Sequence, residues 1–132
     1  MINKENFKEI LEILGFECDK NAKNELYSKS INDQLLSVDF TQERLIYPPE
    51  LSVESESTSN FSQNENFVVF ECVHRLLQRG YKAQDLVLEK TWRLGHSSKS
   101  GRADITIFKT TPDKKERFVY AIIECKTAPK EF

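Results

Sequence analysis

Two apolar segments that each carry charge set the fold of this chain: Gly101-Arg102-Ala103-Asp104-Ile105-Thr106-Ile107-Phe108 and, further along, Ile122-Ile123-Glu124-Cys125-Lys126. Both are typical of buried β-strands, in which successive side chains point to opposite faces. Glu124 and Lys126 therefore share one face. If the two strands pair antiparallel through a turn at 110–117, Asp104 lies beside Glu124.

Two carboxylates at close range repel each other unless a cation lies between them, and an unpaired buried charge is costly. A hard divalent ion such as Mg²⁺, with Mn²⁺ as a substitute, takes one or two carboxylates and keeps several waters. We therefore identify Asp104 and Glu124 as candidate metal ligands. Lys126, two residues or roughly 6–7 Å further along the same face, is placed to orient a bound water or to stabilise a phosphate. This combination suits phosphodiester hydrolysis, and a structural ion pair at the strand ends is the alternative interpretation.

The segments around these strands predict an α/β domain. Apolar residues at helical spacing predict an amphipathic helix over 65–79 that ends at Gly80. Alternation predicts strands over 85–94, 102–108 and 119–126. The order helix, strand, strand, strand favours a central mixed sheet of four or five strands flanked by helices.

The remainder of the chain divides at a polar stretch. Residues 52–66 are rich in Ser, Asn and Glu, and they predict a flexible polar loop. Residues 1–51 are expected to form an acidic α+β extension packed on the core, with a helix at 3–14 and two or three short strands before Pro48-Pro49. The catalytic core would then span 67–132.

Charge is distributed unevenly along the 132 residues. The formal net charge is −2, but residues 1–66 carry 13 acidic and 6 basic residues, whereas 67–132 carry 8 acidic and 13 basic residues. A basic half that holds every candidate catalytic residue favours a nucleic-acid partner. We expect a cytoplasmic protein without a membrane segment, because no long apolar run is present and the three cysteines are too few and too scattered for a disulfide framework.

The pattern of Asp104 followed by Glu124-Cys125-Lys126 resembles the signature of the PD-(D/E)xK nuclease superfamily, with Ala103 where a proline often stands. A longer pattern is similar to the N-terminal nuclease domain of type I restriction enzyme R subunits and of some fused restriction-modification enzymes. It spans roughly 47–128 and comprises Tyr47-Pro48-Pro49-Glu50, Leu76-Leu77-Gln78-Arg79-Gly80-Tyr81, Glu89, Gly101-Arg102-Ala103-Asp104-Ile105 and Ala121-Ile122-Ile123-Glu124-Cys125-Lys126.

This resemblance implies a restriction-endonuclease-like fold and a Mg²⁺-dependent endonuclease that cuts double-stranded DNA. It implies Asp104 and Glu124 as metal ligands and Lys126 as the catalytic lysine. Motor, methyltransferase or specificity domains or subunits would be the partners. ATP would be used only by a motor outside this chain, which has no G-x-x-x-x-G-K-[ST] loop. R-subunit nucleases usually continue into a helix with a Gln-x-x-x-Tyr motif, so we expect the core to be truncated at Phe132.

A further acid is implied by the same resemblance. Superfamily members often carry one on the helix before the sheet, for which Glu71 is the first candidate and Glu89 its rival. The alternative for Glu71 is a solvated helix face or an ion pair with Arg75, four residues on. Glu89 is otherwise an ordinary strand residue, or a partner of Lys90 or Arg102.

The loop before Asp104 offers contacts to a DNA backbone. Lys99, Ser100 and Arg102 supply cations and a hydroxyl, and a flexible polar loop is the alternative. His74, beside the apolar stripe of its helix, is interpreted as structural. Two other functions stay open: a catalytically inactive nuclease-like module that binds DNA or a subunit, and a repair or junction-resolving nuclease of the same superfamily.

Overall fold

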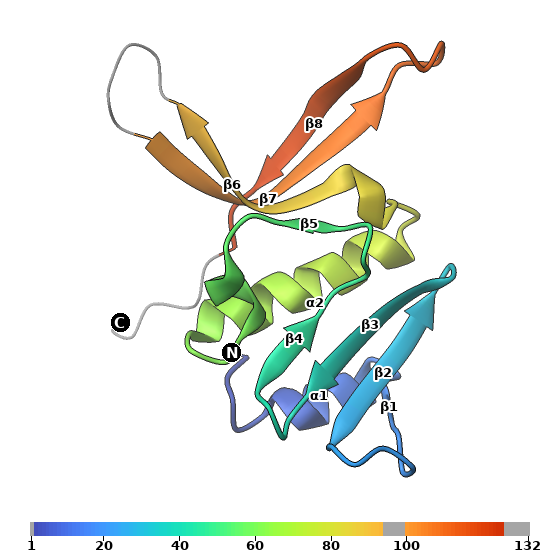
Figure 1. The fold of residues 1–132 in the computed structure, drawn as a ribbon, viewed down its shortest axis with the longest axis vertical. Coiled ribbons are helices and arrows are strands. Elements are labelled where there is room, and N and C mark those ends of the chain that lie inside the picture. Colours follow the sequence, from blue (N-terminus) through green and yellow to red (C-terminus); the bar gives the residue numbers. More distant parts are fainter. Residues whose placement is uncertain (1, 94–99, 126–132) are drawn as a thin grey trace.

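The computed structural model describes residues 2–93 and 100–125, whose arrangement is shown in Figure 1. They form an α/β fold with two four-stranded sheets and two α-helices, α1 (Phe7–Ile13) and α2 (Asn64–Gln78). The longer helix, α2, lies between the two sheets (Figure 1). No helix within these two ranges is long and apolar enough to cross a membrane.

The first sheet is built from the N-terminal part of the chain. Its strands are β1 (Glu17–Cys18), β2 (Leu26–Ile31), β3 (Gln34–Asp39) and β4 (Arg44–Ile46), in the order β1-β2-β3-β4 and all antiparallel. Asn32 and Asp33 join β2 to β3 with positive φ angles of 50° and 65°, which a tight two-residue hairpin requires. Four strands form where two or three were predicted, because a two-residue strand such as β1 is too short for alternation to reveal.

The helix α1 is shorter than the predicted helix over 3–14. Asn3 and Asn6 each accept the other's backbone N–H through a side-chain oxygen, at 3.0 and 2.8 Å, and this closes a turn before the helix begins. Gly15 adopts a φ of 95°, a conformation that glycine tolerates without strain, and the helix ends there as predicted.

The second sheet holds the segments on which the functional prediction rests. Its strands are β5 (Ser52–Val53), β6 (Leu86–Arg93), β7 (Ser100–Thr110) and β8 (Arg117–Ile123), in the order β5-β6-β7-β8. β5 runs parallel to β6, whereas β6, β7 and β8 are antiparallel to one another. This mixed four-stranded sheet agrees with the predicted strand number and the α/β class, but the prediction of a single central sheet did not include the second sheet, β1–β4. α2 agrees with the helix predicted over 65–79.

The segment 52–66 is more ordered than the flexible polar loop that its composition predicts. It contributes β5, the short 3-10 helix η1 (Glu56–Ser59) and the first turn of α2. The buried Asn66 amide donates to the backbone carbonyls of Ser57 and Asn60, at 2.8 and 3.0 Å. Hydrogen bonds of this kind order a polar segment without burying apolar surface, so composition alone did not indicate them.

Strand β8 differs from its prediction as a buried strand running to Lys126. It ends at Ile123 and lies at the edge of the sheet. Four of its apolar side chains are between 39% and 51% exposed: Phe118, Val119, Tyr120 and Ile122. An edge strand has a neighbour on one side only, and hydrophobicity along the chain does not distinguish that position from a central one.

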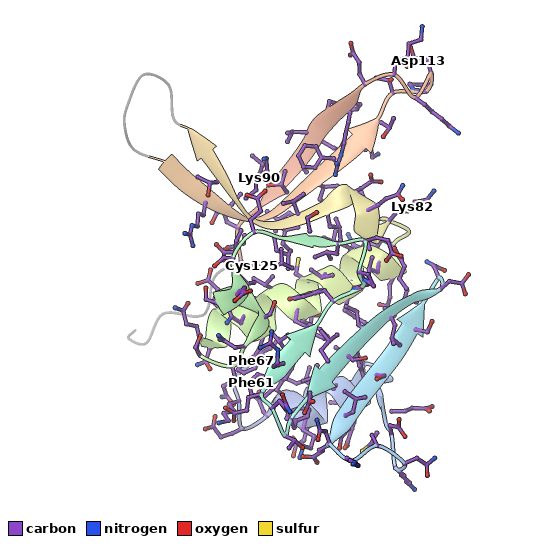
Figure 2. The ribbon with its side chains drawn as sticks, in the orientation of Figure 1. Phe61, Phe67, Lys82, Lys90, Asp113 and Cys125 are labelled. Atoms are coloured by element: carbon purple, nitrogen blue, oxygen red, sulfur yellow. The ribbon has the colours of Figure 1, made fainter. Side chains whose placement is uncertain are left out.

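One hydrophobic core joins both sheets. The Phe7 ring of α1 lies 4.7 Å from the Phe67 ring of α2, between centroids, and Phe67 in turn packs edge-on against Phe61 (Figure 2). The core extends through α2 to Ile105 of β7 and to Cys125 after β8. The sheet that carries the candidate site is therefore supported by residues from the N-terminal sheet, through α2.

Candidate active site

Three carboxylates occupy neighbouring positions on the second sheet. Leu88 pairs with Ile105, and Lys90 with Ala103, so Glu89 of β6 stands opposite Asp104 of β7. On the other edge of β7, Ile105 pairs with Ile123 of β8. Because these strands are antiparallel, the next pair in the same register would be Asp104 with Glu124. The predicted proximity of Asp104 and Glu124 thus agrees with the register, and Glu89 joins them.

Asp104 is the fixed member of this group. It is only 7% exposed, and its Oδ2 accepts a hydrogen bond from the backbone N–H of Cys125 at 2.6 Å. A charge-assisted bond of this kind is stronger than one between neutral groups. It fastens the segment after β8, including Glu124, to the N-terminal half of β7.

Glu89 lies in an unusual backbone conformation. Its φ is +57°, a left-handed geometry that costs a residue with a side chain of the order of 1–3 kcal/mol. Its carboxyl pKa is raised by partial burial and by the nearby charge of Asp104, with Glu124 adding to the effect. Strain and like charges therefore coincide at this position, which is typical of functional sites rather than of ordinary strand residues.

Two neighbouring groups oppose the rise in the Glu89 pKa. The exposed Arg102 lowers it through its charge, and the Thr58 hydroxyl of η1 lowers it as a donor. Within the described ranges no salt bridge joins Glu89 to Arg102, so the two residues interact only through their charges at a longer distance. The buried Thr58 Oγ1 forms no hydrogen bond of standard geometry to any described residue, so its contact with Glu89 is a loose one.

Glu71, the first candidate for the additional acid, is used elsewhere. Its Oε2 accepts hydrogen bonds from Arg75 Nη2 at 2.5 Å and from Arg75 Nε at 3.1 Å. This is the ion pair that the sequence offered as the alternative. Of the two predicted second-rank acids, Glu89 is the one that the structure brings to Asp104 and Glu124.

Sequence reasoning missed three groups on the α2 side of the site. The Cys72 thiol of α2 forms a hydrogen bond with the Cys125 thiol, which lowers the pKa of Cys72 and raises that of Cys125. Glu65, in the first turn of α2, raises the Cys125 pKa further through its charge. The Tyr47 hydroxyl, buried beside both thiols, has no hydrogen-bond partner in the described part of the chain. Of the three groups, only Tyr47 belongs to a motif that the sequence singled out.

The remaining predicted site residues are only partly described. Lys126 and Lys99 lie outside the described residues, and the side chain of Ser100 does as well, although its backbone begins β7. Arg102 lies on the exposed part of β7, next to the acids whose charge it opposes. Cys125 is 5% exposed, as the alternation of side chains predicted.

The donor set fits a hard divalent cation. Mg²⁺ is held by one or two carboxylates and several waters, which Asp104 and Glu124 can provide with Glu89 beside them. Among residues 2–93 and 100–125, no three Asp, Glu, His or Cys side chains close around a common point as a complete protein cage would require.

Comparison of the chain with protein families, with curated proteins and with solved structures found no match.

Proposed function

We propose that this chain is the nuclease domain of a bacterial restriction-modification enzyme, a Mg²⁺-dependent endonuclease acting on double-stranded DNA. The main support is the convergence of Glu89, Asp104 and Glu124 from β6, β7 and the end of β8. The pKa of Glu89 is raised by burial and by the charges of Asp104 and Glu124, and a cation bound among these carboxylates would relieve their repulsion. The fold that the resemblance implies, restriction-endonuclease-like, is part of this proposal.

The chain's own residues would bind the cation, the attacking water and the DNA backbone. Asp104 and Glu124 would ligate the cation, and Glu89 would accept a hydrogen bond from one of its waters. A bound Mg²⁺ supplies a Lewis acid and a lowered pKa for its water. The Cys125 N–H keeps the Asp104 carboxylate in place before the reaction begins. Lys126, by its place in the sequence, would hold the attacking water, and Arg102, with Lys99 and Ser100, would hold the DNA backbone.

The partners follow from the same proposal. Double-stranded DNA is the substrate, and the motor, methyltransferase or specificity components of the parent enzyme act with this domain in the cytoplasm. ATP is consumed by the motor alone. The surplus of basic residues after residue 66 supports a polyanionic partner for this half of the chain.

Calorimetric titration with Mn²⁺ tests the site on the chain itself. We expect Asp104→Asn and Glu124→Gln each to weaken Mn²⁺ binding about a hundredfold, because each removes a charged ligand. Glu116→Gln, an exposed acid in the turn between β7 and β8, is the matched control and should leave binding unchanged. Nicking of a supercoiled plasmid in Mg²⁺ should follow the same order. Mn²⁺ binding that is equal in Asp104→Asn and Glu116→Gln would contradict the proposal.

A catalytically inactive DNA-binding or subunit-binding module is the second candidate. It is favoured by the hydrogen bond from the Cys125 N–H, which occupies one Asp104 oxygen, and by the lack of a closed three-residue ligand group among the described residues. Duplex binding without any Mn²⁺ binding would select it. A repair or junction-resolving nuclease would instead cut a four-way junction in preference to a plasmid.

A further inference from the structure

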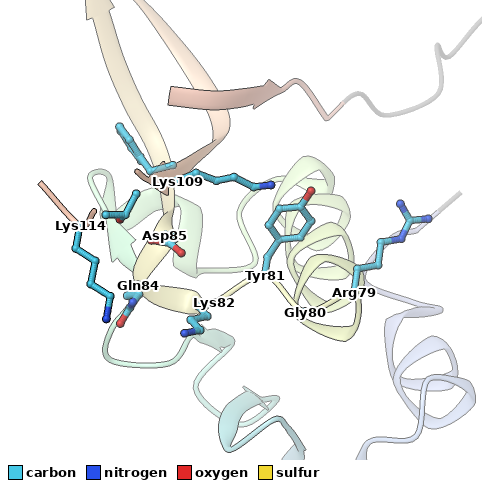
Figure 3. A pocket seen from close by; sticks show the side chains of 10 residues that line it. Arg79, Gly80, Tyr81, Lys82, Gln84, Asp85, Lys109 and Lys114 are labelled. Atoms are coloured by element: carbon cyan, nitrogen blue, oxygen red, sulfur yellow. The ribbon is translucent and has the colours of Figure 1, made fainter. Parts of the chain in front are cut away.

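A cleft of about 820 Å³ lies at the opposite end of β7 from the acids. It is formed where α2 ends, by the 3-10 helix η2 (Ala83–Asp85) and by the hairpin of β7 and β8 (Figure 3). Lys109 on its wall is five residues from Asp104, or about 17 Å along an extended strand. The cleft is therefore a separate site that the proposed metal chemistry does not use.

The cleft is strongly basic. Four cations line it together with the acid Asp85: Arg79, Lys82, Lys109 and Lys114. In the part of the chain that the structure describes, none of the four takes part in a salt bridge. Their charge is thus available to an anionic ligand rather than engaged by the protein's own carboxylates.

Aromatic rings hold one of these cations in place. The Lys109 Nζ lies 3.8 Å from the centre of the Tyr120 ring and 6.0 Å from that of Tyr81, and the two rings are themselves 6.4 Å apart. Figure 3 shows the Lys109 side chain extending toward Tyr81. A cation confined in this way loses less side-chain freedom when it binds an anion.

Two exposed aromatic side chains continue this surface along β8. Phe118 pairs directly with Lys109 and so shares its face of the sheet, while the irregular pairing near Phe108 brings Tyr120 to the same face. Phe118 is 45% exposed and Tyr120 is 50% exposed. In proteins that bind single-stranded nucleic acid, unpaired bases stack on exposed aromatic rings, and neighbouring cations neutralise the phosphates.

The walls of the cleft are fixed to each other. Arg117 of β8 donates a hydrogen bond to the backbone carbonyl of Gln84 in η2 at 3.0 Å, and its guanidinium lies 4.2 Å from the centre of the Phe108 ring. The hairpin is thereby held against η2, so the cleft is formed before a ligand arrives.

We propose that this cleft and the adjoining face of β8 together bind a single-stranded segment of nucleic acid, with phosphates on Lys82 and Lys109 in the cleft and bases stacked on Phe118 and Tyr120 beside it. A duplex keeps its bases stacked on one another and would leave these rings unused. An acidic peptide would use the cations but has no need of two exposed rings. The site goes beyond the proposed function, because it requires neither a metal ion nor cleavage.

Fluorescence anisotropy of a labelled twelve-residue oligothymidine, measured in EDTA over a series of salt concentrations, tests the proposal. We expect Lys109→Glu and Lys82→Glu to weaken binding about tenfold and to lower the slope of log K against log salt by about 0.7 for each phosphate that is no longer neutralised. Phe118→Leu should weaken binding about fivefold with the slope unchanged, because it removes stacking and no charge. Lys23→Glu, an exposed lysine in the turn before β2, is the control and should bind like the wild type.

Three results would overturn the proposal: equal binding by Lys109→Glu and Lys23→Glu, tighter binding of a duplex of the same length, or equal binding of labelled polyglutamate. Thermal unfolding of each variant establishes that it folds. A chain that binds the oligothymidine but neither Mn²⁺ nor plasmid would support this inference while contradicting the proposed function.

Discussion

The two ends of β7 carry opposite chemistry. At one end Asp104 is buried and fastened by a backbone N–H, with Glu89 and Glu124 beside it. At the other end Lys109 is exposed and held by the faces of aromatic rings. The contrast shows that one strand can hold charge in two ways: the Asp104 carboxylate is buried and hydrogen-bonded, and the Lys109 ammonium lies at the surface against aromatic rings.

The strongest perturbation should disrupt both ends at once. Phe70 of α2 is fully buried and contacts the rings of Phe7, Phe16 and Tyr47. Phe70→Ala should lower the free energy of unfolding by about 3–5 kcal/mol, because it leaves a cavity in the shared core. Urea denaturation measures the change, and Mn²⁺ binding and oligothymidine binding should be lost together at the urea concentration where the chain unfolds.

The matched control for Phe70→Ala is Ile13→Ala, since Ile13 is 83% exposed. It should change the free energy of unfolding by less than about 0.5 kcal/mol. If the acidic end lost its ligand well before the basic end in Phe70→Ala, the two ends would not depend on one core.

A smaller effect, on Mn²⁺ affinity, should distinguish Glu89 from Glu71 as the third acid of the candidate site. Glu89→Gln removes a carboxylate beside Asp104 and is expected to weaken Mn²⁺ binding about tenfold. Glu71→Gln removes the largely buried partner of the exposed Arg75, four residues on in α2, and should leave Mn²⁺ binding unchanged, with a loss of about 0.3–0.5 kcal/mol in stability. Calorimetry and urea denaturation of the two variants measure both quantities. The reverse order of Mn²⁺ affinities would assign the third acid to Glu71.

The smallest expected effect is a pH dependence of stability that arises from His74 of α2, the helix that packs beneath β7. His74 is buried, and its Nε2 lies 2.9 Å from Lys29 Nζ. Burial and the charges of Lys29 and Arg75 lower the His74 pKa, and Glu71 opposes them. The unfolded chain therefore binds a proton below about pH 6.5 that the folded chain resists, and stability should fall as the pH drops below that value, by at most about 1.4 kcal/mol per pH unit.

Urea denaturation at pH 7.5 and pH 5.5 measures this dependence. His74→Gln keeps an acceptor for Lys29 and has no titration, so its stability should change less between the two pH values than that of the wild type. An equal change in both proteins would show that His74 has the same pKa in the folded and the unfolded chain.

Elements that show a regular spacing of apolar residues were predicted from the sequence. Segments that are ordered by hydrogen bonds between residues of irregular spacing were not. α2 follows from apolar spacing, which is local, whereas the proximity of Asp104 and Glu124 follows from the two-residue period of a strand only when β7 and β8 pair antiparallel. The segment 52–66 is ordered by the hydrogen bonds from the Asn66 amide to the carbonyls of Ser57 and Asn60. Side-chain periodicity does not predict such bonds.

Some residues of the candidate site could be identified from the sequence, and others could not. Asp104 and Glu124 were identifiable because charge within an apolar strand is costly and therefore informative. Glu89 was ranked below Glu71, because the sequence does not show the left-handed backbone at Glu89 or the ion pair that engages Glu71. The basic cleft could not be predicted, since Lys82 and Lys109 are distant in sequence and meet only when η2 docks against the hairpin.

Local patterns in the sequence were enough to specify which segments become α2, β6, β7 and β8, because side-chain periodicity is a property of neighbouring residues. The packed fold was needed to establish that Cys125 turns back to donate to Asp104, that Glu89 rather than Glu71 joins the acids, and that β8 lies at an edge with its aromatic rings exposed. These features depend on which surfaces are left over once the sheets and α2 have packed, and that outcome is a property of the whole chain.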